Sequence, residues 1–197
     1  MDERLSRPPA QGWVDPTLAL VDRDAFVSDH VYRLEMERIF DRSWIFLAHE
    51  SEIPADGDYV SRRLGSAPVI VVRDADGAVH VLLNSCRHRG ARLCRADSGN
   101  ARNFVCPYHG WTFDKAGRLV TTTFDEHFPE GTDFSRLDLV PAPRVEIHDG
   151  LIFACWDADV IDLVDYLGDI RWYLDALFWR TPGGMEVLAP PHRWRAR

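Results

Sequence analysis

The chain has 197 residues, enough for one or two domains that each bury a hydrophobic core. A hydrophobic content of 46% and a charged content of 27% are those of an ordinary globular protein, and a net charge of −8 argues against a nucleic-acid partner. No stretch approaches the roughly eighteen apolar residues of a membrane-spanning helix, and the first residues show no secretory signal, so the sequence predicts a cytoplasmic protein without membrane contact.

The first 42 residues are predicted to form an arm followed by a helix. Residues 1–23 are polar, contain three prolines and are expected to be extended. A helix is predicted from an N-cap at Asp24 to about Phe40, because Val27, Val31 and the apolar residues after them recur at helical spacing.

From residue 44 the pattern changes to that of antiparallel strands. Four segments are short, rich in β-branched and aromatic residues and bounded by turn residues: 44–49, 58–64, 68–74 and 78–84. Gly77 is expected to supply a positive φ in the hairpin between the last two segments. A second hairpin at 114–117, and a strand pair that turns at Asp149-Gly150, would complete a small β domain over residues 43–157.

The last part of the chain returns to helical periodicity. Segment 121–143 is predicted to be a loop. A helix is predicted between Val160 and Phe178, and Gly168 is expected to split it. Prolines and glycines stop this helix at 181–184, and a strand is expected to begin at Met185.

The most distinctive pattern lies in residues 84–119, which follow the first hairpin and include the second. It contains Cys86-x-His88, seventeen intervening residues and Cys106-x-x-His109. Two soft thiolates and two imidazoles, supplied in matched pairs by two loops, suit a metal site with two different ligand environments. A [2Fe–2S] cluster with cysteines on one iron and histidines on the other is such a site.

Other interpretations of these residues remain open. A structural zinc site usually uses Cys-x2-4-Cys or His-x3-5-His pairs, and neither loop has that form. A Cys86–Cys106 disulfide would need an oxidising compartment, which nothing else in the chain indicates. Cys94 and Cys155 are interpreted as packed free thiols. The remaining histidines are interpreted as solvent-exposed and not as ligands: His30, His49, His80, His127, His148 and His192.

The segments CRHRG (86–90) and CPYHGWTFDKAG (106–117) resemble Rieske iron–sulfur proteins, in particular the N-terminal part of alpha subunits of aromatic-ring-hydroxylating dioxygenases. The resemblance implies a mostly β fold, a Rieske-type antiparallel β-sandwich with two cluster-binding loops. The flanking helices would belong to an α+β catalytic domain, truncated here, of which residues 158–197 are the start. Cys86 and Cys106 would hold one iron, and His88 and His109 the other.

Details of the two loops refine this expectation. Ala91 and Tyr108 stand where respiratory Rieske proteins carry a disulfide, which implies the lower-potential oxygenase type. Tyr108 and Trp111 are expected to shield the cluster from water. Arginines surround the first loop, and they either steer an acidic ferredoxin, contact a neighbouring subunit or are merely solvated: Arg87, Arg89, Arg92 and Arg95.

The family resemblance also implies a reaction and partners. Electrons would pass from NAD(P)H through a reductase, often via a ferredoxin, to this cluster and then to a mononuclear Fe(II) that only the full-length subunit would hold. The net reaction would add both atoms of dioxygen to a small aromatic substrate, giving a cis-dihydrodiol. A beta subunit and a trimer of alpha subunits are the expected assembly.

The iron-binding motif of that catalytic domain, carboxylate-x2-His-x4-His, does not occur in these residues. The chain is therefore expected to deliver electrons, and no residue is predicted to be catalytic on the substrate. The alternative to an oxygenase part is a self-standing Rieske ferredoxin. A zinc-loaded structural module is the third interpretation.

Overall fold

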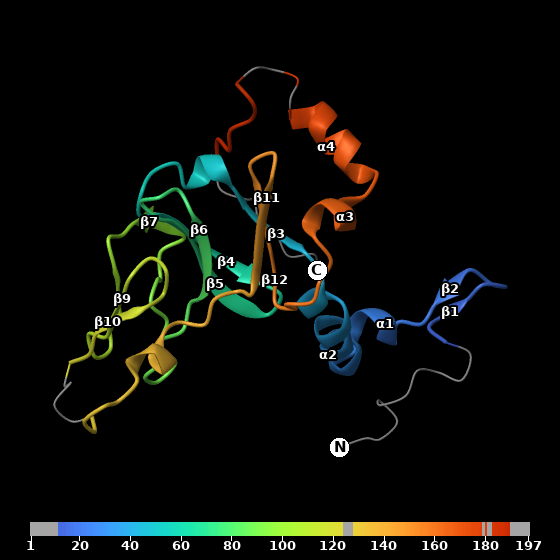
Figure 1. Ribbon diagram of the computed structural model, residues 1–197. Coiled ribbons are helices and arrows are strands. Elements are labelled where there is room, and N and C mark those ends of the chain that lie inside the picture. The colour runs from blue at the N-terminus through green and yellow to red at the C-terminus, as the bar shows by residue number, and fades with distance from the viewer. Residues whose placement is uncertain (1–11, 124–127, 179, 181–182, 190–197) are drawn as a thin grey trace.

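The computed structural model describes residues 12–123, 128–178, 180 and 183–189. Its β-strands form three larger antiparallel sheets and one short N-terminal hairpin (Figure 1). The hairpin pairs β1 (Val14–Asp15) with β2 (Leu20–Val21), and the sheets are described in turn below.

The four-stranded sheet has the order β6-β5-β4-β7. Its strands are β4 (Asp58–Leu64), β5 (Ala67–Arg73), β6 (Val79–Leu83) and β7 (Ser98–Asn100). A three-stranded sheet, β11-β12-β3, packs against it and contains β3 (Ile45–His49), β11 (Arg144–His148) and β12 (Leu151–Cys155). The other three-stranded sheet, β10-β9-β8, contains β8 (Phe104–Val105), β9 (Thr112–Phe113) and β10 (Leu119–Thr121).

Strand β5 is buried on both faces, which explains its uninterrupted apolar sequence. Val69 and Val71 belong to the core between the two larger sheets. Ile70 and Val72 belong to a second core that includes the cysteines of the CRHRG and CPYHGW segments. Each fully buried aliphatic side chain contributes roughly 1.5–3 kcal/mol to the stability of the fold. Because its side chains enter both cores, β5 joins the β-sandwich to the loops that would bind a metal.

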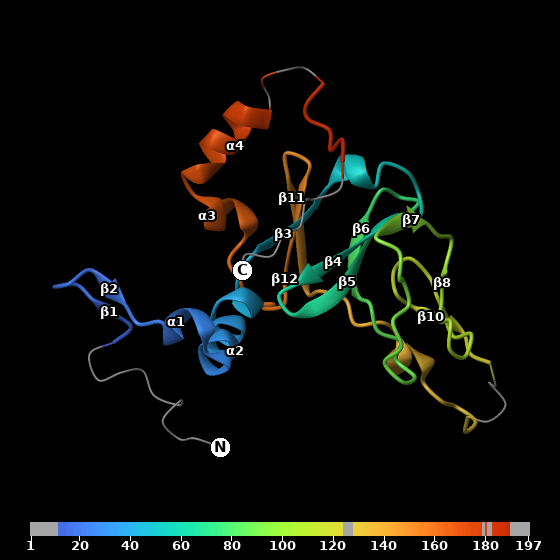
Figure 2. The same ribbon diagram turned by 180° about the vertical axis from the view of Figure 1, so that it is seen from behind.

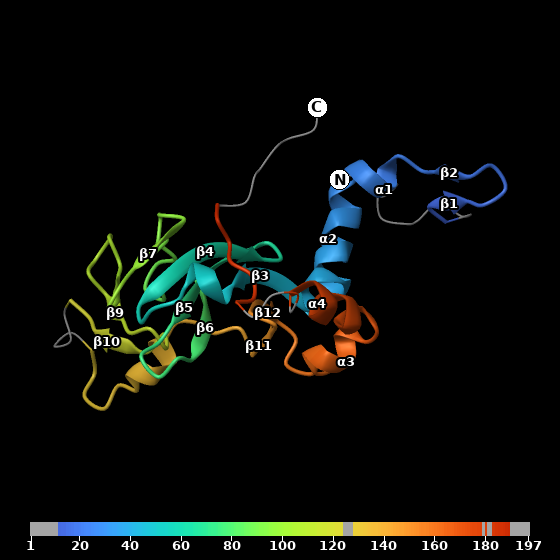
Figure 3. The same cartoon turned by 90° about the horizontal axis from the view of Figure 1, so that it is seen from above.

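Strand β12 has two apolar faces for the same reason. Ile152 and Ala154 point into the core between the sheets, whereas Phe153 and Cys155 pack against Leu163 on the opposite side. Leu163 begins helix α3 (Leu163–Leu167), which is followed by α4 (Ile170–Phe178). Figure 3 shows both helices on the side of β11 and β12 that is away from β5 and β6.

The N-terminal helices lie at one end of the molecule, and β8–β10 lie at the other (Figures 1 and 2). The single predicted helix is divided in two, α1 (Asp24–Val27) and α2 (Asp29–Arg38), because Ser28 adopts an extended conformation with ψ of 121°. The N-cap prediction was also wrong: Asp24 is inside α1, and Arg23 precedes it without a side-chain cap.

Several short elements were not predicted. They are β1 and β2 in the expected arm, β7 and β8 between the two motif halves, and three 3₁₀ turns: Phe40–Arg42, Glu50–Glu52 and Phe134–Leu137. Conversely, no strand forms between Met185 and Ala189, where one was expected. In that segment the N–H of Val187 donates to Oγ of Ser51 (3.0 Å), a side chain and not a strand partner.

The predicted strands and hairpins are otherwise confirmed. Gly77 and Gly117 have φ of +87° and +89°, as their hairpins require, and Gly168 separates α3 from α4 with φ of +50°. The described part of the chain contains no helix that is both long and apolar enough to cross a membrane. The domain boundaries at residues 42 and 157 stay predictions.

Candidate metal centre

Two loops with the same backbone hydrogen bonds carry the predicted ligands. We call residues 84–94 the first ligand loop and residues 106–111 the second ligand loop. In each, the cysteine N–H donates to the carbonyl five residues later, and a glycine N–H four residues later donates to the cysteine carbonyl. These N···O distances are 2.8 and 2.8 Å around Cys86 and 2.7 and 3.0 Å around Cys106. The two glycines, Gly90 and Gly110, share a φ of +72°, which closes both turns.

The two cysteine side chains are buried, each with 3% of its surface exposed. Burial raises the pKa of the Cys86 thiol, and the neighbouring Cys106 raises it further. The backbone N–H groups of His88 and Arg89 donate toward the Cys86 sulfur and act in the opposite direction, because they favour the thiolate. Amide donors aimed at a buried sulfur are what a metal-bound thiolate needs.

The two histidine rings lie against each other. Nδ1 of His88 lies 3.1 Å from Nδ1 of His109, and the ring centroids are 4.8 Å apart at 61°. Two nitrogen ligands, each about 2.1 Å from a shared metal ion, stand roughly 3 to 3.4 Å apart. The separation of the two Nδ1 atoms therefore fits one ion held between them.

Aromatic rings fix the orientation of both imidazoles. Trp111 is buried and stacks on His88, with centroids 4.8 Å apart and an interplanar angle of 11°. Tyr108 lies against His109 at 3.7 Å between centroids, but 58% of its surface is exposed. The predicted shield is thus formed mainly by Trp111, while Tyr108 covers the outer edge of the site.

One end of the site is buried, and the other end is exposed to solvent. Its cysteines are buried in the core beneath β5, whereas His88 is exposed and His109 is half-buried. Desolvation by neighbouring groups, followed by the charges of His109 and Arg89, lowers the pKa of His88, which favours the neutral imidazole that binds metals. A donor set of two buried thiols and two accessible imidazoles fits a [2Fe–2S] group with unlike irons.

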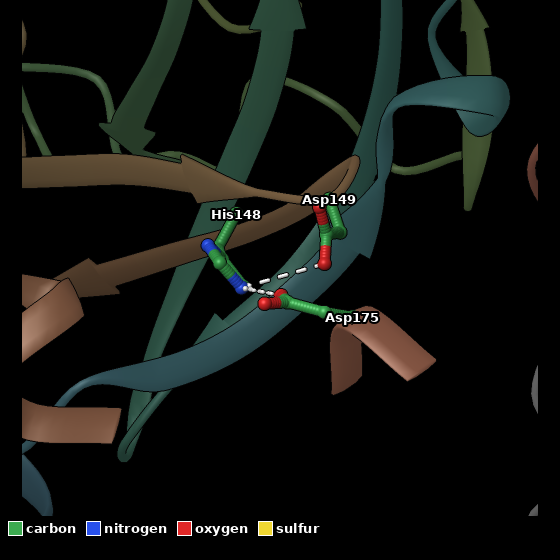
Figure 4. A group of neighbouring side chains, drawn as sticks. All are labelled: His148, Asp149 and Asp175. Atoms are coloured by element: carbon green, nitrogen blue, oxygen red, sulfur yellow. Dashed lines mark hydrogen bonds and ion pairs between the residues drawn. The ribbon is translucent and has the colours of Figure 1, made fainter. Parts of the chain in front are cut away.

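A separate group of potential ligands lies where α4 meets the β11–β12 hairpin (Figure 4). Nε2 of His148 is 3.0 Å from a carboxylate oxygen of Asp175 and 3.4 Å from one of Asp149. In the described residues, this is the only place where three such ligand atoms lie within 4.8 Å of one another. The predicted ligands of the two loops do not form such a trio.

These contacts, with a stacked His49–Phe178 pair at 6.3 Å, attach α4 to the β domain. The predicted exposure of His49 and His148 was therefore wrong: His49 is buried and His148 is half-buried. Sequence periodicity gave no signal for this, because both residues are covered by a helix distant in the chain. His30 and His80 are half-buried too, away from α4. The expectations for His127 and His192 fall outside the described residues.

Comparison with known proteins supports the interpretation of the two loops as a metal-binding site. The family described as Rieske [2Fe-2S] domain matches residues 43–130. Biphenyl 2,3-dioxygenase subunit alpha of Rhodococcus jostii is 44% identical over 184 residues, which are 92% of this chain and 39% of that protein. N,N-dimethyl phenylurea N-demethylase subunit alpha of a Sphingobium species is also 44% identical, over 90% of this chain and 39% of that protein.

A solved structure gives the same result. Naphthalene 1,2-dioxygenase from a Rhodococcus species, bound to indole, superposes with a TM-score of 0.79 and 44% identity. The match covers 84% of this chain and 38% of that one. The chain thus spans about two fifths of the length of these relatives.

Proposed function

We propose that this chain, which belongs to the Rieske [2Fe–2S] proteins and corresponds to the N-terminal part of aromatic-ring dioxygenase alpha subunits, delivers electrons to an oxygen-activating iron. Cys86 and Cys106 would hold one iron of the cluster, and His88 and His109 the other. When bound, the cluster supplies one-electron transfer at roughly −150 to +300 mV. The observation that carries the proposal is the pairing of two buried thiols with two imidazoles whose Nδ1 atoms lie 3.1 Å apart.

The protein's own residues set the conditions for this transfer. Burial of the cysteines excludes water from the sulfur end, and the N–H groups of His88 and Arg89 stabilise negative charge on Cys86. Trp111 holds the His88 ring in one plane. The exposed imidazole edge is the shortest route for an electron between the buried end and a partner, and it can also release or accept a proton.

The partner is proposed to be an acidic ferredoxin or an NAD(P)H-dependent reductase. Although the whole chain carries −8, the first ligand loop presents exposed arginines on both sides of His88: Arg87, Arg89 and Arg92. A local cationic rim on an acidic protein favours an acidic carrier at this surface, because complementary charge accelerates encounter. Salt should therefore slow reduction of the cluster by such a carrier, and Arg89→Gln should weaken this dependence. Arg33→Gln, on α2, is the control.

In an alpha subunit that contains these residues, the electrons would serve oxygenation of a small aromatic molecule, with cis-dihydroxylation as the proposed reaction. Similarity along 92% of the chain, helices α3 and α4 included, supports this over a self-standing ferredoxin. N-demethylation is a second candidate, favoured by the equal identity to the demethylase subunit. Labelled dioxygen separates the two: dihydroxylation retains both atoms in the product, and demethylation releases formaldehyde.

The assembly and location also form part of the proposal. A beta subunit and a ring of three alpha subunits would bring the exposed histidine edge against a neighbouring subunit. A cytoplasmic location, where thiols stay reduced, agrees with the four free cysteines of the structure.

The decisive test is spectroscopic. The purified chain, supplied with iron and sulfide, should be red-brown and should give the electron paramagnetic resonance signal of a reduced mixed-ligand cluster. His109→Cys should lower its midpoint potential or abolish the cluster, because a thiolate adds negative charge. His80→Gln, outside both loops, should change neither property. A colourless protein that binds zinc, or a His109→Cys variant with unchanged potential, would contradict the proposal.

A further inference from the structure

Asn84 is the most deeply buried polar side chain near the ligand loops, with 1% of its surface exposed. Its Oδ1 accepts the N–H groups of Leu93 (3.0 Å) and Cys94 (2.9 Å), and its Nδ2 donates to the carbonyl of Cys94 (2.8 Å). The opposite amide orientation would set donors against donors, so the network fixes which atom is oxygen. One side chain therefore joins the two ends of the first ligand loop.

The second ligand loop needs no such residue. Strands β8 and β9 pair on either side of it, with Phe104 opposite Phe113 and Val105 opposite Thr112. These ladder bonds hold the ends of the loop together and set the spacing of Cys106 and His109.

The first ligand loop lacks this support. It begins after β6 and leads to β7, and these two strands form opposite edges of the sheet ordered β6-β5-β4-β7. The segment that enters the loop from β6 and the segment that leaves it toward β7 therefore run to opposite edges of the sheet. The turn bonds around Cys86 close only its inner part, to Ala91. The three bonds of Asn84 close the outer part, in the place that the β8–β9 ladder takes in the second loop.

We propose that Asn84 is a positioning residue that replaces a strand pair and holds Cys86 and His88 at the spacing the cluster needs. This inference rests on the proposed function. Its physical basis is that a buried amide with all these partners is stable only in one loop conformation, because any opening of the loop leaves buried donors and acceptors unpaired. The backbone N–H donors toward the Cys86 sulfur lie inside the same loop and move with it.

The test compares two Asn84 variants with a matched asparagine. Asn84→Leu keeps the number of side-chain heavy atoms and the branching at Cγ and removes all three bonds. Asn84→Asp keeps the two acceptor bonds but sets an oxygen against the Cys94 carbonyl. The control is Asn100→Leu, since exposed Asn100 also makes two side-chain bonds, to Asp56 and Asp58, away from the loops.

Three measurements are expected to change in the Asn84 variants and not in the control. Iron loss to a chelator should accelerate by about 10- to 100-fold, as for other supporting residues of metal ligands. The midpoint potential should fall, because looser N–H groups stabilise the reduced cluster less. The Leu93 and Cys94 amides should lose protection from hydrogen exchange, in the chain with and without cluster.

The outcomes separate this inference from the proposed function. A wild-type chain that takes up no [2Fe–2S] cluster refutes the proposed function, and hydrogen exchange then still decides whether Asn84 closes the loop. A wild-type chain that holds the cluster, with Asn84 variants that lose it no faster, refutes the positioning role alone. Variants whose circular dichroism shows a loss of the whole β domain also refute it, since Asn84 would then stabilise the fold and not the loop.

Discussion

Replacing Trp111 by alanine removes the ring that stacks on His88 and fills part of the core beneath the ligand loops. Trp111 is 6% exposed, and it contacts His88 at 4.8 Å and Phe128 at 6.2 Å between ring centroids. Truncating a buried aromatic ring of this kind costs roughly 3–5 kcal/mol, because transfer energy is lost and a cavity remains. For a chain of this size that corresponds to a fall in Tm of roughly 6–20 °C.

The first assay is thermal unfolding of the metal-free chain, followed by circular dichroism. The second is the electron paramagnetic resonance spectrum of the chain that carries the [2Fe–2S] cluster. Trp172→Ala is the matched control, because Trp172 on α4 is 67% exposed and its loss should change stability by no more than about 0.5 kcal/mol. Trp111→Phe should give a smaller loss of stability than alanine and keep a ring against His88. The spectrum should broaden in Trp111→Ala, since the imidazole is no longer held in one plane.

The reasoning would be refuted if Trp111→Ala and Trp172→Ala lowered Tm equally. A large loss of stability with an unchanged spectrum would be equally informative. It would mean that Trp111 fills the core but does not orient His88.

Three further predictions concern other parts of the chain. Burial raises the pKa of the Cys94 thiol to about 11, so at pH 8 only about one thousandth of it is thiolate. Iodoacetamide should therefore label Cys94 far more slowly in the folded chain than in urea. Equal labelling rates would contradict its interpretation as a packed thiol. Gly150→Ala should lower the urea midpoint more than Gly77→Ala: both have positive φ, but an added Cβ at Gly150 would lie 2.5 Å from Nε2 of His49, whereas at Gly77 it meets nothing within 4 Å. A hydrogen bond from the next backbone N–H lowers the pKa of the Asp74 carboxyl, so its contribution to stability is present at neutral pH and is lost as the pH falls below about 4. Asp74→Asn should therefore flatten the acid dependence of the urea midpoint, and an unchanged dependence would show that other carboxyls cause it.

The strands and turns of the β domain follow from local chemistry, which explains why most of them could be predicted. Alternating or continuous β-branched runs mark β4 and β5, and Gly77 marks the hairpin after them because its φ of +87° is costly for other residues. The break at Ser28 gave no comparable signal, since serine tolerates both helical and extended backbone. The short strands β7 and β8 were missed because they are defined by their partners and not by their own residues.

The ligand set was predicted from the spacing of Cys and His residues together with the resemblance to Rieske proteins, and it stays a prediction. Cys86 and His88, like Cys106 and His109, are close in sequence, so each pair is fixed by one tight turn and can be recognised without the fold. The residues that support these two pairs cannot be recognised without the fold. Asn84 bonds to residues nine and ten positions away, and its importance depends on β6 and β7 leaving toward opposite edges of a sheet.

The sequence by itself was thus enough to predict the ligand chemistry, because a two-residue or three-residue spacing within a turn leaves little freedom for where its side chains point. Only the tertiary structure decided which end of the site is dry, which ring holds His88, and that His148 meets Asp175 on α4. These features join segments that are far apart in the chain. Their contacts depend on how sheets and helices pack, and no local pattern of residues encodes that packing.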